Sequence, residues 1–173
     1  SNGPTLAFKD LGLQLLGNLF EIVLDGKELN ILGATSGDTG SAAIHAMLGR
    51  KGVRVFMLAP RRGMSEFQSA QMWGVNDPAI HNIAIRGSFD NCQDVVKAIN
   101  ADGYFKDVYH LGAINSINWA RIAAQIVYYV WLYLRVCGDI SLEKEIDVAV
   151  PTGNFGNIYA AYVAKMIDRK SVV

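Results

Sequence analysis

The stretch NILGATSGDTG, residues 30–40, combines the signals of a strand, a turn and a helix start. Its first part, NILGA (30–34), is a short apolar run of the kind that forms a buried strand. Its second part, TSGDTG (35–40), contains glycines and small hydroxyl side chains, and it leads into the helical pattern SAAIHAML (41–48). A strand, a glycine-containing turn and a helix in this order predict one βα unit.

The same alternation recurs along the whole chain. Further strands are predicted at VRVFMLA (53–59), HNIAIRG (81–87), VYHLGA (108–113) and IDVAVP (146–151). Helices are predicted at about residues 6–23, 39–50, 65–74, 89–101, 116–136 and 157–168. Strands and helices that alternate at this spacing predict an α/β fold with three αβα layers, a mostly parallel sheet and right-handed crossovers. Ligands of such sheets bind at the carboxyl ends of the strands.

Composition excludes several classes of function. The chain has 173 residues, 51% of them hydrophobic, and its 16 basic and 16 acidic side chains cancel, which gives no electrostatic basis for binding nucleic acid or an acidic membrane. Cys92 and Cys137 form no close-spaced pair and lie near no histidine cluster, so we expect no metal site and no disulfide framework. The longest charge-free apolar run, residues 122–134, is shorter than the roughly 20 residues that span a bilayer. We therefore expect a cytoplasmic protein.

A lysine stands near the start of the first predicted helix. In GPTLAFKD (3–10), Thr5 is the expected helix cap and Lys9 lies in the first turn. A buried face is predicted from apolar residues at helical spacing, namely Leu6, Leu11, Leu15, Leu19 and Ile22. Burial lowers the pKa of a lysine, and the uncharged amine is the nucleophile that forms Schiff bases with carbonyls. Lys9 is therefore a candidate nucleophile.

Three loops are suited to anions, although each also has a purely structural explanation. TSGDTG places backbone N–H groups at a helix N-terminus, which favours carboxylate or phosphate, but glycine also serves a tight turn. PTGNFGN (151–157) can form a phosphate-binding nest, and it lacks both the lysine of a Walker loop and the spacing of a dinucleotide fingerprint. NSINWAR (115–121) is either a helix cap followed by a surface arginine or a group of polar side chains gathered at a helix N-terminus.

Taken in order, GPTLAFKD, TSGDTG, NSIN with its following arginine, and GNFGN closely resemble the threonine synthase family. These are pyridoxal-phosphate enzymes of fold type II, the tryptophan synthase β-like group. The resemblance implies a two-domain enzyme of which this chain is a partial segment. Residues 1–29 would belong to the larger, cofactor-binding domain, residues 30–115 would form the smaller parallel α/β domain, and residues 116–173 would return into the larger domain.

The resemblance also implies roles for individual residues. Lys9 would be the catalytic residue, bonded covalently to the cofactor pyridoxal 5'-phosphate and then moving protons on the substrate. Asp38, where related enzymes often carry asparagine, would lie beside the ring hydroxyl of the cofactor. The cofactor phosphate would be held by the backbone of Gly153, Asn154, Phe155, Gly156 and Asn157. The substrate would contact Thr35, Ser36, Gly37 and Thr39 through its carboxylate, and Asn115, Ser116 and Arg121 through its phosphate.

The implied reaction converts O-phospho-L-homoserine and water into L-threonine and phosphate by γ-elimination and β-hydration, which makes the enzyme a carbon–oxygen lyase of threonine biosynthesis. The expected partners are this small substrate and the rest of the parent chain, with a homo-oligomer left open. We expect the isolated segment to be inactive, because half of an interdomain cleft cannot exclude water. Two alternatives remain at this point: a fold type II dehydratase or sulfhydrylase, which needs no site for a substrate phosphate, and a noncatalytic domain that binds a phosphate ligand.

Overall fold

The computed structural model describes residues 3–114, 119–138, 145–151 and 153–168. The chain divides into two compact units, residues 1–115 and 116–173.

The first unit is built on a four-stranded parallel sheet. Its strands are β1 (Leu29–Ala34), β2 (Val53–Pro60), β3 (Ile80–Ile85) and β4 (Leu111–Ala113), in the order β3-β2-β1-β4. All three neighbouring pairs are parallel. The carboxyl ends of β1, β2 and β3 therefore lie along one edge of the sheet, where ligand-binding residues are expected.

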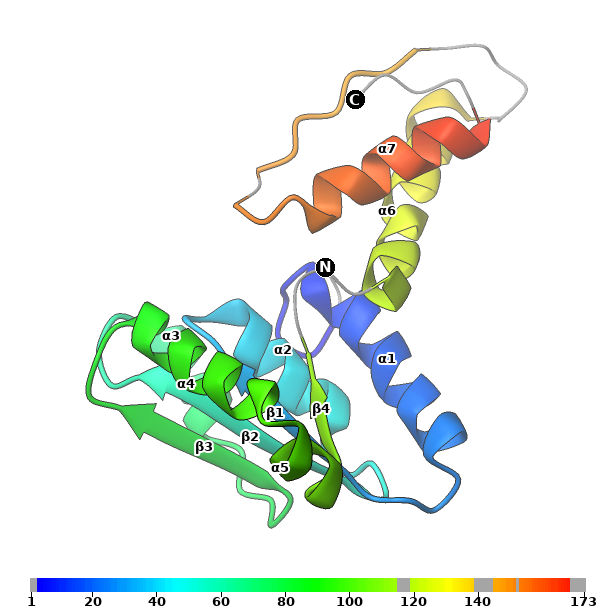
Figure 1. Ribbon diagram of the computed structural model, residues 1–173. Helices are drawn as coiled ribbons and strands as arrows, with labels where there is room; N and C mark the ends of the chain where they lie inside the picture. The colour runs from blue at the N-terminus through cyan, green and yellow to red at the C-terminus, as the bar shows by residue number, and fades with distance from the viewer. Residues whose placement is uncertain (1–2, 115–118, 139–144, 152, 169–173) are drawn as a thin grey trace. The chain divides into compact units, whose positions relative to one another are not determined.

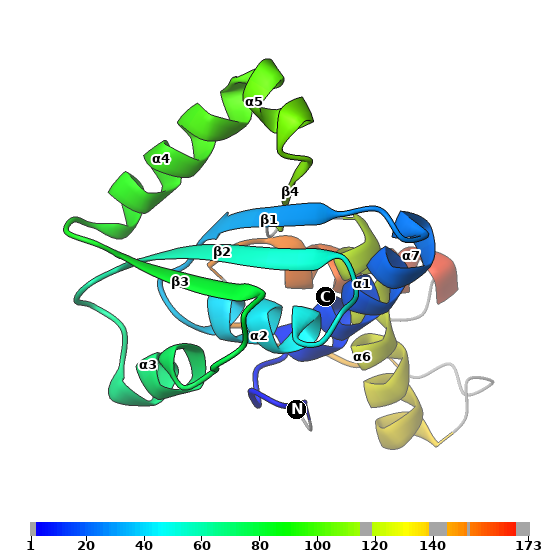
Figure 2. The same cartoon turned by 90° about the horizontal axis from the view of Figure 1, so that it is seen from below.

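Helices cover both faces of this sheet, which gives the predicted three layers. The helices are α1 (Lys9–Leu24), α2 (Asp38–Met47), α3 (Glu66–Trp73), α4 (Phe89–Ala101) and α5 (Gly103–Val108). Figure 1 shows the unit as a whole, and Figure 2 shows α4 and α5 on one side of the strands with α1, α2 and α3 on the other. The fully buried side chains between the layers are mainly aliphatic, and they include Leu13, Ile31, Ile44, Val55 and Met57.

The helix α1 packs against α2 at very short range. A Cβ atom at Gly17 of α1 would lie 2.4 Å from the backbone oxygen of Ala46 in α2. Only glycine leaves room for this approach of two backbones. The element that carries Lys9 is therefore fixed tightly to the element that begins at Asp38.

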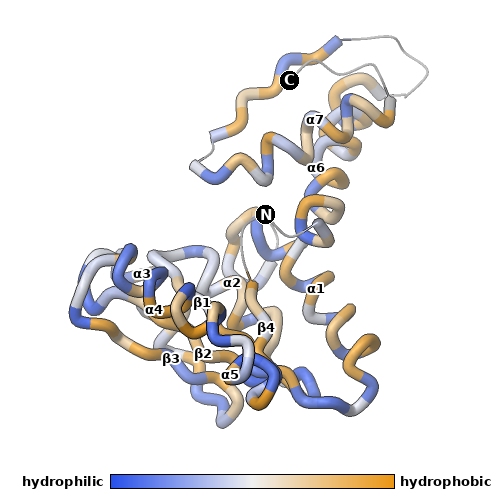
Figure 3. Tube along the Cα trace, viewed as in Figure 1, coloured by the Kyte–Doolittle hydropathy of each residue, from blue (hydrophilic) through white to orange (hydrophobic). Residues whose placement is uncertain are grey.

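The buried face of α1 is not the one predicted. Leu6, Leu11, Leu15 and Ile22 are all exposed, whereas the residues that α1 buries are Asp10, Gly12, Leu13, Leu16 and Gly17. Apolar residues recur around α1 (orange in Figure 3), so periodicity alone did not single out the face that meets α2.

One predicted strand boundary and one predicted strand were wrong. The segment 108–113 forms a strand only from Leu111, because α5 occupies the residues before it and Asp102 caps that helix by accepting a hydrogen bond from the amide of Phe105 at 3.0 Å. The predicted strand 146–151 is reduced to a bridge at Asp147. A strand needs a neighbour to pair with, and the described residues of the second unit form helices rather than further strands.

The second unit contains α6 (Trp119–Cys137) and α7 (Gly156–Asp168), which pack against each other. Its buried side chains include Ile122, Ala124, Ala160 and Ala161. None of the helices in the described part of the chain has the length and apolar character needed to cross a bilayer.

Candidate active site

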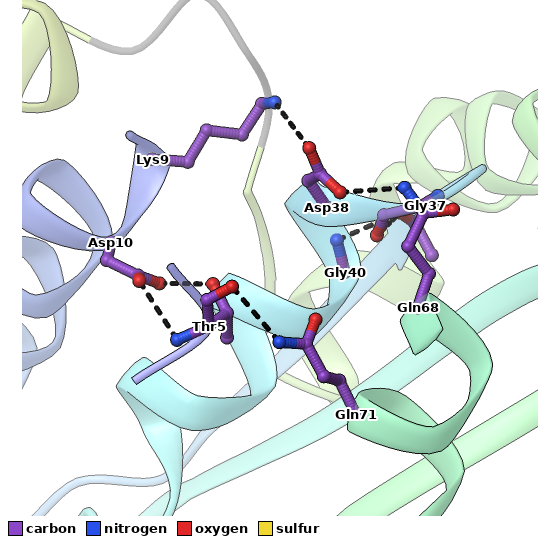
Figure 4. Close-up of polar contacts among 9 residues, drawn as sticks. Thr5, Lys9, Asp10, Gly37, Asp38, Gly40, Gln68 and Gln71 are labelled. Carbon is purple, nitrogen blue, oxygen red and sulfur yellow. Dashed lines mark hydrogen bonds and ion pairs between the residues drawn. The ribbon is translucent and has the colours of Figure 1, made fainter. Parts of the chain in front are cut away.

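Lys9 is the first residue of α1, three residues after the start that the sequence predicted, and its amine lies beside the TSGDTG loop. The Nζ atom is 4.0 Å from Oδ2 of Asp38 and 4.5 Å from the centroid of the Phe8 ring. Figure 4 shows the two side chains pointing toward each other from α1 and α2. A carboxylate and an aromatic face both stabilise the charged ammonium. The surroundings of Lys9 are thus less apolar than the sequence suggested.

The turn before Lys9 is held by a buried carboxylate. Asp10 accepts hydrogen bonds from the Thr5 amide at 3.0 Å and the Thr5 hydroxyl at 2.6 Å (Figure 4). The Thr5 carbonyl in turn accepts a bond from Nε2 of Gln71, on α3, at 3.0 Å. Thr5 is therefore not the helix cap that we expected, because α1 begins at Lys9 with Phe8 at the N-cap position.

Thr35 organises the TSGDTG loop from within. Its buried hydroxyl accepts hydrogen bonds from the amides of Gly37 at 3.1 Å and Gly40 at 2.8 Å, and it lies 3.0 Å from the carbonyl oxygen of Gly37. A Cβ atom at Gly40 would lie 2.3 Å from the Thr35 methyl group, so this fold of the loop requires glycine there. The hydroxyl of Thr35 is thus engaged inside the loop that was predicted to bind the substrate.

The remaining loop residues present polar groups at the end of β1. Ser36 and Asp38 are exposed, and Thr39 is half-buried. Asp38 begins α2, where a carboxylate interacts favourably with the helix dipole. Its Oδ1 atom accepts a hydrogen bond from Nε2 of Gln68 at 2.7 Å. The first unit therefore brings together Lys9, Asp38 and the TSGDTG loop.

In the second unit, the GNFGN loop lies directly before α7. Gly153, Asn154 and Phe155 are exposed, and Gly156 is the first residue of the helix. The amide of Tyr159 donates to the carbonyl of Phe155 at 2.8 Å and closes the first turn. The first N–H groups of a helix have no acceptor within the helix, so this end of α7 is suited to an anion.

The Asn157 side chain belongs to a polar network between α6 and α7. Its Oδ1 atom accepts a hydrogen bond from the Tyr129 hydroxyl, and its Nδ2 atom donates to Gln125 at 2.8 Å. Gln125 also donates to the backbone carbonyl of Arg121 at 3.0 Å. Since the Asn157 amide is used in this way, the group that it can offer to a ligand is its backbone N–H.

Arg121 is buried in α6, with only 2% of its surface exposed. The alternative of a surface arginine is therefore wrong. Burial lowers the pKa of the Arg121 guanidinium below its ordinary value, but arginine remains charged in proteins. Asn115 and Ser116, which were predicted to act with Arg121, lie outside the described residues.

Sequence reasoning missed three residues that hold the site together: Asp10, Gln68 and Gln71. Asp10 carried a weak signal as an acidic residue in the first turn of a helix. The two glutamines lie three residues apart on α3. Gln68 donates to Asp38 in the TSGDTG loop, and Gln71 donates to the carbonyl of Thr5 in the turn before Lys9.

These features define an α/β protein in whose first unit Lys9 and the TSGDTG loop lie together at the carboxyl edge of a parallel sheet. The sequence model of the pyridoxal-phosphate dependent enzymes matches residues 1–170. The chain belongs to this family of pyridoxal-phosphate dependent enzymes.

Individual proteins similar to this chain narrow the comparison to one enzyme within the family. The chain is 58% identical to the threonine synthase of Methylobacillus glycogenes over 169 residues, which cover 96% of the chain and 35% of that protein. It resembles the structure of yeast threonine synthase with a TM-score of 0.86 at 45% identity, covering 98% of the chain and 35% of that structure. It also resembles the pyridoxal-phosphate-bound threonine synthase of Brucella melitensis, with a TM-score of 0.85 at 45% identity over 94% of the chain and 35% of that structure. The chain thus spans about a third of the length of these relatives.

Proposed function

We propose that this sequence is part of a threonine synthase, which converts O-phospho-L-homoserine and water into L-threonine and phosphate. The observation that carries the proposal is the position of Lys9 at the head of α1, 4.0 Å from the carboxylate in the TSGDTG loop. The identity of 58% to a threonine synthase supports this substrate over those of the dehydratases and sulfhydrylases. The proposed protein is a cytoplasmic lyase that acts on a phosphate ester.

The residues present fit pyridoxal phosphate as the cofactor. The aldehyde of the cofactor requires a primary amine, which Lys9 supplies. Its phosphate requires N–H donors, and the exposed GNFGN loop at the start of α7 supplies these without a side chain in the way, since a Cβ atom at Gly153 would meet nothing within 4 Å. When bound, the cofactor withdraws electrons from the substrate carbons and so makes their protons removable.

Lys9 would act as nucleophile and then as general base. Both roles need the uncharged amine, whereas Asp38 and Phe8 stabilise the ammonium. The amine must therefore give up a proton when it leaves the Asp38 carboxylate. The four-carbon stem of the lysine allows the Nζ atom to move while α1 remains in place.

Arg121 would hold the phosphate of the substrate. A buried guanidinium offers two parallel N–H groups to a phosphate, and low exposure to water strengthens such charge-assisted bonds. Asn115 and Ser116 would complete this group at the start of α6.

We also propose that residues 1–29 and 116–173 belong to the larger domain of the enzyme and residues 30–115 to the smaller one. The exposed apolar side chains of Leu11, Leu15 and Ile22 on α1 support this division, because a larger domain would cover them. On this division, residues 1–173 alone should form no threonine even with excess cofactor.

The test uses the full-length protein that carries this sequence. Purified with pyridoxal phosphate, it should absorb visible light and release phosphate from O-phospho-L-homoserine with formation of threonine. Borohydride reduction and peptide mass mapping should place the cofactor on Lys9. An adduct on Lys51 or Lys97 would contradict the assignment, and deamination of serine without activity on phosphohomoserine would favour a dehydratase.

A further inference from the structure

Both the oxygen and the nitrogen of the Gln68 side-chain amide form hydrogen bonds. It is the third residue of α3, whose N-cap is Ser65, and its Oε1 atom accepts a hydrogen bond from the Ser65 amide at 3.2 Å. The Ser65 hydroxyl accepts a bond from the backbone amide of Gln68 at 3.2 Å, which completes a capping box. The Nε2 atom donates to Asp38 at 2.7 Å. Since a backbone N–H can only donate and an ionised carboxylate can only accept, these partners fix the orientation of the amide.

Gln68 lies so close to the TSGDTG loop that a side chain at position 37 would displace its amide. A Cβ atom at Gly37 would lie 2.6 Å from Nε2 of Gln68 (Figure 4). The Gln68 side-chain amide thus contacts three parts of the site: the backbone of the TSGDTG loop, the start of α3 and the Asp38 carboxylate.

Asp38 needs such support because about half of its side chain is exposed and would otherwise rotate in solvent. With Oδ1 held by Gln68, Oδ2 is directed to the amine of Lys9 at 4.0 Å. We propose that Gln68 is a positioning residue that holds the Asp38 carboxylate toward Lys9 and, through it, orients the reactive amine. This inference rests on the proposed role of Lys9.

The test compares two amide removals in the full-length, cofactor-loaded protein. Gln68→Met keeps the length of the side chain and removes the bond to Asp38. Asn91→Leu is the matched control, because Asn91 has the same capping-box role with Ser88 in α4, where its Oδ1 atom accepts from the Ser88 amide at 2.8 Å. Gln68→Met should lower kcat about 5- to 10-fold with KM little changed, and shift the visible absorption of the bound cofactor. Asn91→Leu should do neither.

A double-mutant cycle separates positioning from general destabilisation. If Gln68 acts through Asp38, then adding Gln68→Met to Asp38→Ala should lower kcat by no more than about twofold further, because Asp38→Ala has already removed the acceptor of the Gln68 amide. A full 5- to 10-fold loss in the Asp38→Ala background, or an equal loss in Asn91→Leu, would overturn the proposal. A parent protein without a visible band or threonine formation would instead overturn the proposed function, so the two failures are distinguishable.

A second, independent observation concerns the ends of β2 and β3. An open hollow of about 310 Å³ is lined by Arg61, Arg62, Arg86 and Gly87. The amide of Arg61 donates to the carbonyl of Ile85 at 2.9 Å, which joins the ends of the two strands. Three arginines therefore line one opening.

These arginines differ from others in the same unit. Arg50 and Arg54 pair with Glu21 and Glu28 at 2.6 and 2.8 Å. Within the described residues, no carboxylate lies within ion-pair distance of the three arginines that line the hollow. Neighbouring like charges repel, and an anion that bridges them relieves this repulsion.

We infer that the hollow binds a small polyanion with two or more phosphate or carboxylate groups. Inorganic pyrophosphate is the probe, titrated calorimetrically into the full-length protein at low salt. Arg86→Ala should weaken binding about tenfold by loss of a charge-assisted contact, whereas Arg54→Ala should leave it unchanged. Absence of binding, or an equal loss in Arg54→Ala, would overturn the inference.

Discussion

The carboxylate of Asp10 accepts both the backbone amide and the hydroxyl of Thr5, so a buried charge closes the turn that presents Lys9. We expect Asp10→Ala to lower the free energy of unfolding by about 2–4 kcal/mol, because it leaves two buried donors without an acceptor. Urea unfolding of the full-length protein followed by circular dichroism measures this. Asp25→Asn, at the left-handed C-cap of the same helix, is the control and should stay within about 0.5 kcal/mol. Equal losses in both variants would show that the Thr5 contacts contribute nothing specific.

Gly40 should tolerate no side chain. We expect Gly40→Ala to destabilise the protein by about 1–3 kcal/mol, since the new Cβ atom collides with Thr35 and must displace the loop. Gly103→Ala is the matched change, because a Cβ atom there meets nothing within 4 Å, and it should leave stability unchanged or raise it. Thermal unfolding of both variants provides the comparison, and a stable Gly40→Ala protein would argue against the described loop conformation.

The Tyr129 hydroxyl should make stability depend on alkaline pH. Burial raises the pKa of Tyr129 above its ordinary value, so the unfolded chain releases this proton at a lower pH than the folded one. The contribution of Tyr129 is therefore complete below the ordinary pKa of about 10 and is lost as the pH rises above it. Tyr129→Phe should remove this dependence and cost about 0.5–1.5 kcal/mol at neutral pH. In the exposed Tyr162→Phe control, the pH profile should match that of the unmodified protein.

Replacement of Gly156 should expel the cofactor. Gly156→Asp introduces a side chain and a negative charge at the start of α7, where we propose that the cofactor phosphate binds. Fluorescence titration of the full-length protein with pyridoxal phosphate measures the affinity. Gly103→Asp makes the same change at the start of α5 and should leave the affinity intact. Unchanged affinity in a folded Gly156→Asp variant would place the phosphate elsewhere.

Replacement of Arg121 should lower the turnover of the phosphorylated substrate and leave the absorption spectrum of the cofactor nearly unchanged. Arg121→Ala removes a charge-assisted hydrogen bond of about 1.5–3 kcal/mol, so kcat/KM for phosphate release should fall roughly 10- to 150-fold. Arg121→Lys should recover only part of this loss, because an ammonium cannot form the planar two-pronged contact. Because Arg121 is buried, circular dichroism must show that the variants are folded. Full efficiency in a folded Arg121→Ala protein would contradict the proposed role.

The fold of the first unit could be predicted because its signals are local. Each βα unit has an apolar run, a turn and a helix close together in the sequence, and β1, β2 and β3 occur where the runs predicted them. The short helix α5 was missed because its six residues carry little periodicity. The strand expected at 146–151 was wrong because a strand depends on a partner that the local sequence does not specify.

The candidate site could be predicted only where a motif carries it. Lys9 and the TSGDTG loop are recognisable in the sequence, and the structure brings them together. The support from Gln68 and Gln71 was not predictable, because these contacts join residues 30 and 66 positions apart and depend on the packing of α3. The burial of Arg121 was likewise invisible, since one arginine in an apolar helix pattern does not show which side faces inward.

The tight crossing of α1 and α2 at Gly17 and Ala46 determines which part of the site can adjust. Two backbones in direct contact cannot slide past each other without first separating. Because Gln68 holds the Asp38 carboxylate, the separation between the Lys9 amine and that carboxylate is governed by the side-chain torsions of Lys9. Rotation about these torsions can move the Lys9 amine toward or away from the Asp38 carboxylate. The backbones of α1 and α2 stay in place during this movement.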